Sequence, residues 1–149
     1  FEKLHDRLAH IGATLLIKAL RDYCAGTLQP HEQKHELATV IAMVKKEDGK
    51  ADWQRAAREI YNQYRAYHTW PGLWTEINGL LIKIIVCKPD DTGKIADATS
   101  GTLVMRNKIL YMVCGMGLLE LITLQPAAKK PMSAAEFING YRSVIKQVE

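Results

Sequence analysis

The sequence predicts an α+β fold, a small antiparallel β-barrel with flanking helices, preceded by a helix and an extended linker. Three observations indicate this arrangement. Apolar residues recur at helical spacing near the N-terminus, a polar stretch of about 25 residues follows without a clear element, and about five short strand-like runs lie between residues 73 and 125. Five antiparallel strands in so short a stretch favour a closed barrel over an open sheet.

The first element is a helix over residues 2–24. Leu4, Leu8, Ile11 and Leu15 fall on one face, and Gly26 provides a C-terminal stop. We expect an exposed apolar stripe here unless another body covers it. The polar stretch then gives three parts: residues 1–26 as a terminal helix, 27–52 as a linker, and 53–149 as the barrel domain.

A second helix is expected to begin at Asp52, a residue type that favours the N-cap position. Trp53, Ala57 and Ile60 would form its core face. The opposite face is either simply solvated or suited to contact phosphates. It carries three arginines: Arg55, Arg58 and Arg65.

Turn and cap signals place the remaining elements. Asn78-Gly79 lies between two apolar runs and predicts a hairpin, because both residues accept positive φ. Further strands break at residues 106–108 and 115–117. Ser133 and Glu136 have the spacing of a capping box. The final helix that they start would turn four side chains inward: Phe137, Tyr141, Val144 and Val148.

Composition bounds the function classes. The chain has 149 residues, 48% of them hydrophobic, and a net charge of +4, which permits an anionic partner without requiring one. Cys24, Cys87 and Cys114 are far apart, so they indicate neither a disulfide framework nor a thiolate zinc site, and a reducing compartment fits them. No apolar run is long enough to span a membrane.

Motifs for catalysis are missing. The sequence contains neither a phosphate-binding glycine loop nor a G-x-S-x-G nucleophile elbow. His31 and His35 have the i, i+4 spacing of metal ligands, but Glu32 is the only close carboxylate, so no metal site is predicted. Basic residues and aromatic rings remain as candidate binding groups. Trp70, Trp74 and Tyr111 could stack on bases, or the tryptophans could be core anchors.

Three segments in series resemble methionyl-tRNA formyltransferase: "KEDGKADW" (46–53), "IYNQYRAYHTWPG" (60–72) and "LQPAAKKPMSAAEF" (124–137). They match that family's linker and C-terminal domain in order and spacing. Residues 4–30 are similar to the last helix of its catalytic domain and the exit into the linker. The resemblance therefore covers essentially the whole chain, and it implies that the barrel is OB-like.

The resemblance also implies a reaction and its partners. The family transfers a formyl group from 10-formyltetrahydrofolate to the methionine of initiator tRNA, in a cytoplasmic (bacterial) or organellar compartment. Its catalytic motifs are absent here, so we expect this chain to be inactive alone, with no catalytic, donor-binding or metal-binding residue. Its expected partners are initiator tRNA and an N-terminal catalytic domain. The candidate tRNA-contacting residues are Lys45, Lys46, Arg65, Lys83, Lys129, Lys130 and Arg142, of which Lys46, Arg65, Lys129 and Lys130 fall on matching family positions.

Two alternatives stay open. The barrel could belong to a related formyltetrahydrofolate-dependent enzyme that acts on a sugar nucleotide or on folate, although a small substrate needs no long basic track. It could also be a protein-docking barrel, with residues 1–24 packed on a neighbouring body.

Overall fold

The computed structural model describes residues 2–147, which divide into a first unit ending at Met43 and a second beginning at Val44. The first unit contains α1 (Glu2–Cys24) and a short 3-10 helix, η1 (His35–Leu37). The predicted helix over residues 2–24 is confirmed, and Gly26 follows it with a φ of 73°. The apolar stripe of α1 is exposed, as expected: 52–63% of the surface of Leu4, Leu8, Ile11 and Leu15 is accessible.

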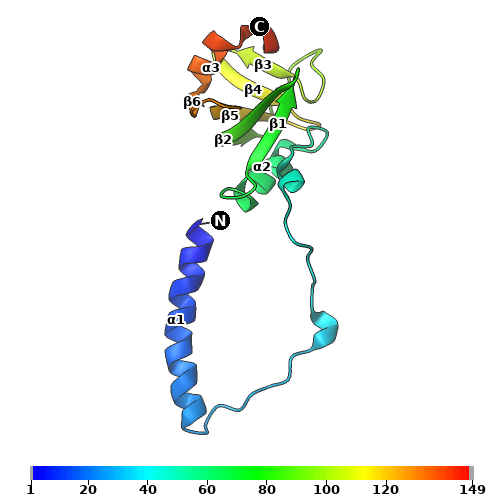
Figure 1. Cartoon of the computed structure of the whole chain (residues 1–149). Coiled ribbons are helices and arrows are strands. Elements are labelled where there is room, and N and C mark those ends of the chain that lie inside the picture. The colour runs from blue at the N-terminus through cyan, green and yellow to red at the C-terminus, as the bar shows by residue number, and fades with distance from the viewer. Residues whose placement is uncertain (1, 148–149) are drawn as a thin grey trace. The chain divides into compact units, whose positions relative to one another are not determined.

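The second unit is a curled, mostly antiparallel sheet with short helices (Figure 1). Its strands are β1 (Leu73–Ile77), β2 (Leu80–Asp90), β3 (Leu103–Arg106), β4 (Ile109–Val113), β5 (Leu118–Pro126), β6 (Met132–Ser133) and β7 (Lys146–Gln147). Its helices are α2 (Ala57–Ala66) and α3 (Ala134–Gly140), with the 3-10 turns η2 (Lys46–Gly49) and η3 (Arg142–Val144).

The sheet is open rather than closed. Its strand order is β1-β2-β5-β4-β3-β7, with β6 paired to β5, so within residues 2–147 the ladder is a path with two ends. The expected α+β class is confirmed, but the sheet does not close into the expected barrel. At one end β7 is only two residues long and runs parallel to β3. At the other end β1 is met by a single isolated bridge between Trp74 and Lys50.

The core lies inside the curl of the sheet. Side chains alternate along each strand, so Leu73, Ile82 and Leu124 are buried while their strand neighbours face outward. Figure 1 shows α2 and α3 at opposite ends of the sheet. Each helix contributes a fully buried side chain to the same core, Ile60 from α2 and Phe137 from α3. Tyr64 further fixes α2 by donating its hydroxyl to the carbonyl oxygen of Ile85 at 3.0 Å.

Two of the hairpin turns, β1–β2 and β3–β4, are formed by residues with positive φ. Asn78 and Gly79, at φ of 51° and 79°, connect β1 to β2, which confirms the predicted hairpin. Asn107 and Lys108, at 52° and 64°, connect β3 to β4 at the expected break. The break at residues 115–117 separates β4 from β5.

The start of the second helix was predicted wrongly. α2 begins at Ala57 rather than Asp52. The carbonyl oxygens of Trp53 and Arg55 both accept hydrogen bonds from the Gly115 amide, at 2.8 and 3.0 Å. These bonds hold residues 53–55 against the β4–β5 connection in a turn. Asp52 therefore caps only a local turn, accepting from the Gln54 amide at 3.1 Å.

The last helix is shorter than predicted. α3 ends at Gly140, and Tyr141 leaves helical geometry with φ −129° and ψ 35°. The inward positions of Phe137 and Tyr141 are confirmed, and their rings stack with centroids 4.6 Å apart. Val144 packs on the core from η3 instead of from a continuous helix, and Val148 lies outside the described residues. Within residues 2–147 no helix combines the length and apolar character needed to cross a membrane.

The predicted capping box at the start of α3 is confirmed. The Ser133 hydroxyl accepts from the Glu136 amide at 3.3 Å, and the Glu136 carboxylate accepts from the Ser133 amide at 2.7 Å. The hydrogen bond from that amide, together with one from the Ser133 hydroxyl, lowers the pKa of Glu136 below 4.5.

Replacing Ser133 with alanine should lower the free energy of unfolding by about 1 kcal/mol, the usual cost of losing a serine N-cap. Aspartate at the same position should retain most of the stability. Because the pKa of Glu136 is lowered on folding, its stabilising contribution is fully present above about pH 4.5 and is lost as the pH falls through the lowered value. Urea titrations at pH 7 and pH 3 would measure both effects, and equal stability of the serine and alanine proteins at pH 7 would contradict the cap.

Candidate nucleic-acid interface

The lysines that precede α2 are fixed against β1 by their backbone. The Trp74 indole nitrogen donates to the carbonyl oxygen of Lys46 at 3.1 Å, and the Ala51 amide donates to the carbonyl oxygen of Trp74 at 2.8 Å. Between these two bonds Gly49 is buried against Gly72. The segment from Lys46 to Ala51, all of which the sequence analysis assigns to the linker, is therefore part of the folded second unit.

An outward-facing row of side chains crosses three strands beside this segment. Trp74 of β1 lies opposite Lys83 of β2, and Lys83 lies opposite Gln125 of β5. All three alternate with buried neighbours, so they share the outer face of the sheet. The side chain of Lys83 runs over Gly72, whose missing Cβ leaves room for it: an added Cβ would lie 3.2 Å from the lysine Nζ.

The twin lysines continue this row. The Gln125 side-chain amide donates to the carbonyl oxygen of Lys129 at 2.9 Å, and the Lys129 amide donates to the carbonyl oxygen of Pro126 at 3.1 Å. The Ala127 amide also donates to the carbonyl oxygen of Leu81 at 2.9 Å, which ties the loop to β2. The β5–β6 loop thus presents Lys129 and Lys130, both exposed, from a fixed backbone.

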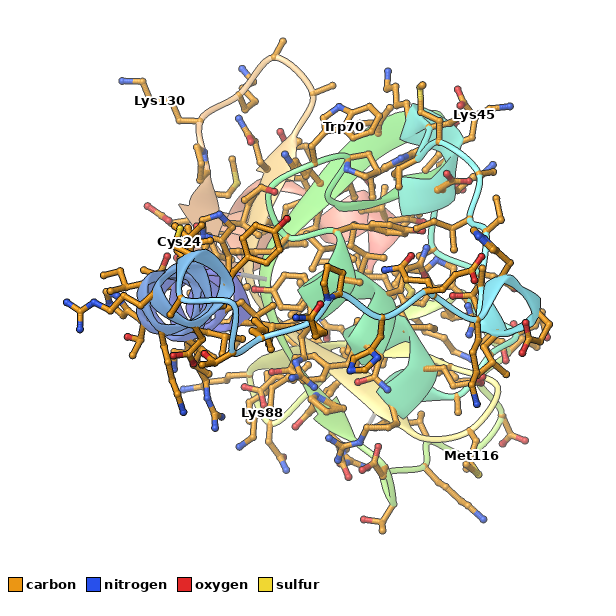
Figure 2. All side chains as sticks on the ribbon, turned by 90° about the horizontal axis from the view of Figure 1, so that it is seen from below. Cys24, Lys45, Trp70, Lys88, Met116 and Lys130 are labelled. Carbon is orange, nitrogen blue, oxygen red and sulfur yellow. The ribbon has the colours of Figure 1, made fainter. Side chains whose placement is uncertain are left out.

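We call the lysines on and beside these contacts the cationic rim: Lys45, Lys46, Lys50, Lys83, Lys129 and Lys130. Lys50 belongs to it because its Nζ lies 5.8 Å from the centroid of the Trp74 ring. Figure 2 shows Lys45 and Lys130 on the same side of the second unit, with Trp70 between them, and Lys88 and Met116 on the opposite side. Sequence analysis missed Gln125, because only the strand register reveals that this neutral side chain connects Lys83 to Lys129.

Two other candidates lie on elements that carry no lysine of the cationic rim. Arg65 is in the last turn of α2, with its guanidinium 6.0 Å from the centroid of the Tyr61 ring and a 3.5 Å contact to the Asn62 side-chain oxygen. Arg142 begins η3, which leads into β7 at the sheet edge farthest from β1. Five of the seven candidate residues thus belong to the cationic rim, and the other two come from α2 and η3.

The arginine ridge expected on the second helix does not form a free cationic surface. Arg55 precedes α2 and pairs with Glu59 at 3.2 Å, and Arg58 pairs with Asp91. The hydrogen bond and charge of Asp91 raise the pKa of Arg58, and the bonds from Ala56 and Arg55 lower the pKa of Glu59. Both arginines already have an anionic partner, so they are poorly suited to bind phosphate.

The two buried cysteines and the search for metal ligands complete the account of candidate chemistry among residues 2–147. Cys87 and Cys114 are buried, and burial raises the pKa of each thiol to about 12, so neither supplies a thiolate nucleophile at neutral pH. Among residues 2–147, no group of three or more His, Cys, Asp or Glu side chains lies close enough to hold a metal ion.

The second unit matches a known protein family. The family described as "Formyl transferase, C-terminal domain" matches residues 43–142. That range begins one residue before the second unit and includes every lysine of the cationic rim.

The chain is also similar to three bacterial proteins named methionyl-tRNA formyltransferase. It is 34% identical to that of Sorangium cellulosum over 140 residues, 39% to that of Roseiflexus castenholzii over 139, and 38% to that of Solibacter usitatus over 140. These alignments cover 93–94% of this chain but only 44–45% of each relative. The chain thus spans less than half the length of the curated relatives it matches.

Among solved structures, HypX from Aquifex aeolicus has a similar fold. One variant matches with a TM-score of 0.60 and 14% identity, over 89% of this chain and 24% of HypX. The structure of HypX in complex with tetrahydrofolic acid matches with a TM-score of 0.57 and 15% identity, over 89% of this chain and 24% of HypX. With the family match over residues 43–142 and the curated relatives, the chain belongs to the formyl transferase C-terminal domain family.

Proposed function

We propose that the second unit is the OB-like tRNA-binding part of a methionyl-tRNA formyltransferase. The whole enzyme would formylate the methionine of initiator tRNA with 10-formyltetrahydrofolate, and this chain would hold the tRNA while another part of the enzyme performs the transfer. By itself the chain would be inactive. It would work where translation takes place, in the bacterial cytoplasm or an organelle.

One observation carries this proposal: contacts through Trp74 of β1 and Gln125 of β5 connect the lysines of the cationic rim across three strands. Lys46 is joined to Trp74, Trp74 lies beside Lys83, and Lys83 lies beside Gln125, which holds Lys129. A sugar–phosphate backbone presents negative charges at regular intervals, so lysines spread over η2, β2 and the β5–β6 loop suit it better than they suit one small phosphate. Such contacts position an RNA without reading its sequence.

The family supports the same assignment, since relatives named methionyl-tRNA formyltransferase match almost the full chain. In contrast, the exposed apolar stripe of α1 favours a second role, docking on another body. The two roles are compatible because they use different units: α1 would pack on protein, while the cationic rim would face RNA.

Replacing both Lys129 and Lys130 with alanine tests the proposal. We expect weaker binding of a tRNA transcript and a shallower dependence of log affinity on log salt. The slope should fall by about 1 for each phosphate contact removed. Filter binding between about 50 and 200 mM salt would measure both quantities.

Lys88→Ala is the matched control. Lys88 is an exposed lysine that lies opposite Glu120 in the β2–β5 ladder and on the far side from Lys130 (Figure 2). This variant should keep the wild-type affinity and slope. If Lys88→Ala weakened binding as much as the double variant, binding would depend on total charge and the proposed face would be wrong.

A further inference from the structure

Trp70 occupies a fixed position at the tip of the loop between α2 and β1. The Gly72 amide donates to the carbonyl oxygen of Tyr67 at 2.8 Å, closing the loop, and the next residue, Leu73, is fully buried. Despite this anchoring on both sides, 57% of the surface of Trp70 is exposed. The loop therefore presents a large aromatic ring to solvent from a defined backbone.

The other two tryptophans have structural partners. Trp53 packs against the core and donates its indole nitrogen to the Thr75 hydroxyl at 2.9 Å. Trp74 donates to Lys46, and Lys50 lies over its ring. Among the residues that the structure describes, Trp70 makes no corresponding hydrogen bond or ring contact. Packing in the core thus explains why a tryptophan stands at position 53. The hydrogen bond that holds the Lys46 segment explains Trp74, but neither role applies to Trp70.

The surroundings of Trp70 are cationic. Gly72, two residues after Trp70, is covered by the side chain of Lys83. Figure 2 shows Trp70 between Lys130 and Lys45 on the same side of the second unit. An exposed aromatic ring among lysines is how proteins bind single-stranded nucleic acid: the ring stacks on a base while the lysines contact the flanking phosphates. A base inside a duplex has both faces covered by its neighbours, so only an unpaired base could accept this ring.

We propose that the indole of Trp70 stacks on an unpaired nucleobase of the RNA, an inference that rests on the proposed function of the cationic rim. The contact extends that function from holding the sugar–phosphate backbone to recognising a single-stranded segment or loop. Because every base has a π-face, the contact tolerates any base.

The test compares Trp70→Leu and Trp70→Phe in the full chain. The probes are a tRNA transcript, a single-stranded RNA of roughly 12 nucleotides, within the usual range of site sizes, and the same sequence as a duplex. We expect Trp70→Leu to weaken single-strand binding by about five- to a hundredfold. Its salt slope and its duplex affinity should not change, because the lysines are intact.

Trp70→Phe, which keeps an aromatic ring, should recover most of the lost affinity for the single strand. Equal urea midpoints would show that all three proteins are folded.

The outcomes separate this contact from the proposed function. If the wild-type chain binds tRNA in a salt-dependent way and Trp70→Leu binds the single strand equally well, the stacking contact is wrong and the cationic rim stands. An equal loss of duplex binding would also overturn it, because stacking on an unpaired base cannot affect a duplex. If the wild-type chain binds no tRNA, both proposals fail together.

Discussion

Replacing Gly49 with alanine should lower the free energy of unfolding of the second unit by about 3 kcal/mol and weaken tRNA binding as well. An added Cβ would overlap the carbonyl oxygen of Gly72 and lie 3.0 Å from Pro71 Cγ and 3.1 Å from Trp74 Cδ1. Two of these neighbours belong to the backbone or to a proline ring, so they cannot move aside easily. The chain would have to move η2 away from β1.

Such a shift would break the attachment of the cationic rim at one end. The bonds at risk are those from Trp74 to Lys46 and from Ala51 to Trp74. Urea titration followed by tryptophan fluorescence would measure the stability, since all three tryptophans lie in the second unit. Filter binding would measure the affinity for tRNA.

Gly140→Ala is the control for this variant. Gly140 is the last residue of α3, and an added Cβ there would meet nothing within 4 Å. Alanine should leave both stability and binding close to wild type. If Gly49→Ala retained the wild-type urea midpoint, the close packing of η2 on β1 would be contradicted.

Replacing Phe137 with alanine should lower the free energy of unfolding by about 4 kcal/mol, at least as much as Gly49→Ala does. It should have no specific effect on RNA binding. Phe137 is fully buried and its ring stacks on Tyr141, and α3 packs through it against the core. Truncation would leave a cavity that a small sheet domain cannot fill by collapse. The same urea titration would report the loss.

Asn139→Ala serves as the comparison, because Asn139 is exposed on the same helix. Its effect should stay within about 0.5 kcal/mol. Phe137→Leu should fall between the two, since leucine restores part of the lost volume. A cost of less than about 1 kcal/mol for Phe137→Ala would show that α3 does not contribute to the core as the structure indicates.

Local signals allowed much of the fold to be predicted from the sequence. The periodicity of residues 2–24, the Asn78-Gly79 turn and the Ser133–Glu136 cap each depend on residues close in the chain, and the structure confirms all three. Features set by distant residues were not predictable in the same way. α2 starts late because Gly115 binds the carbonyl oxygens of Trp53 and Arg55, and no local pattern contains that information.

The candidate site follows the same division. Charge alone indicates Lys83, Lys129 and Lys130, but their alignment depends on the register of β2 with β5. That register includes irregularities between Ile84 and Cys87, which change the alternation of the strand. The pairing of Arg58 with Asp91, 33 positions further along the chain, likewise removed an expected phosphate contact that helical periodicity alone could not rule out.

The tethering of lysine backbones by Trp74 and Gln125 has a thermodynamic consequence. Because folding already fixes the carbonyl oxygens of Lys46 and Lys129, ordering the main chain costs nothing further when a polyanion arrives. Only the rotamers of the long side chains lose freedom, at roughly 0.5–1.5 kcal/mol each if they become immobile. Lysines that stay partly mobile on a rigid support would let a bound polyanion shift along the surface and leave quickly.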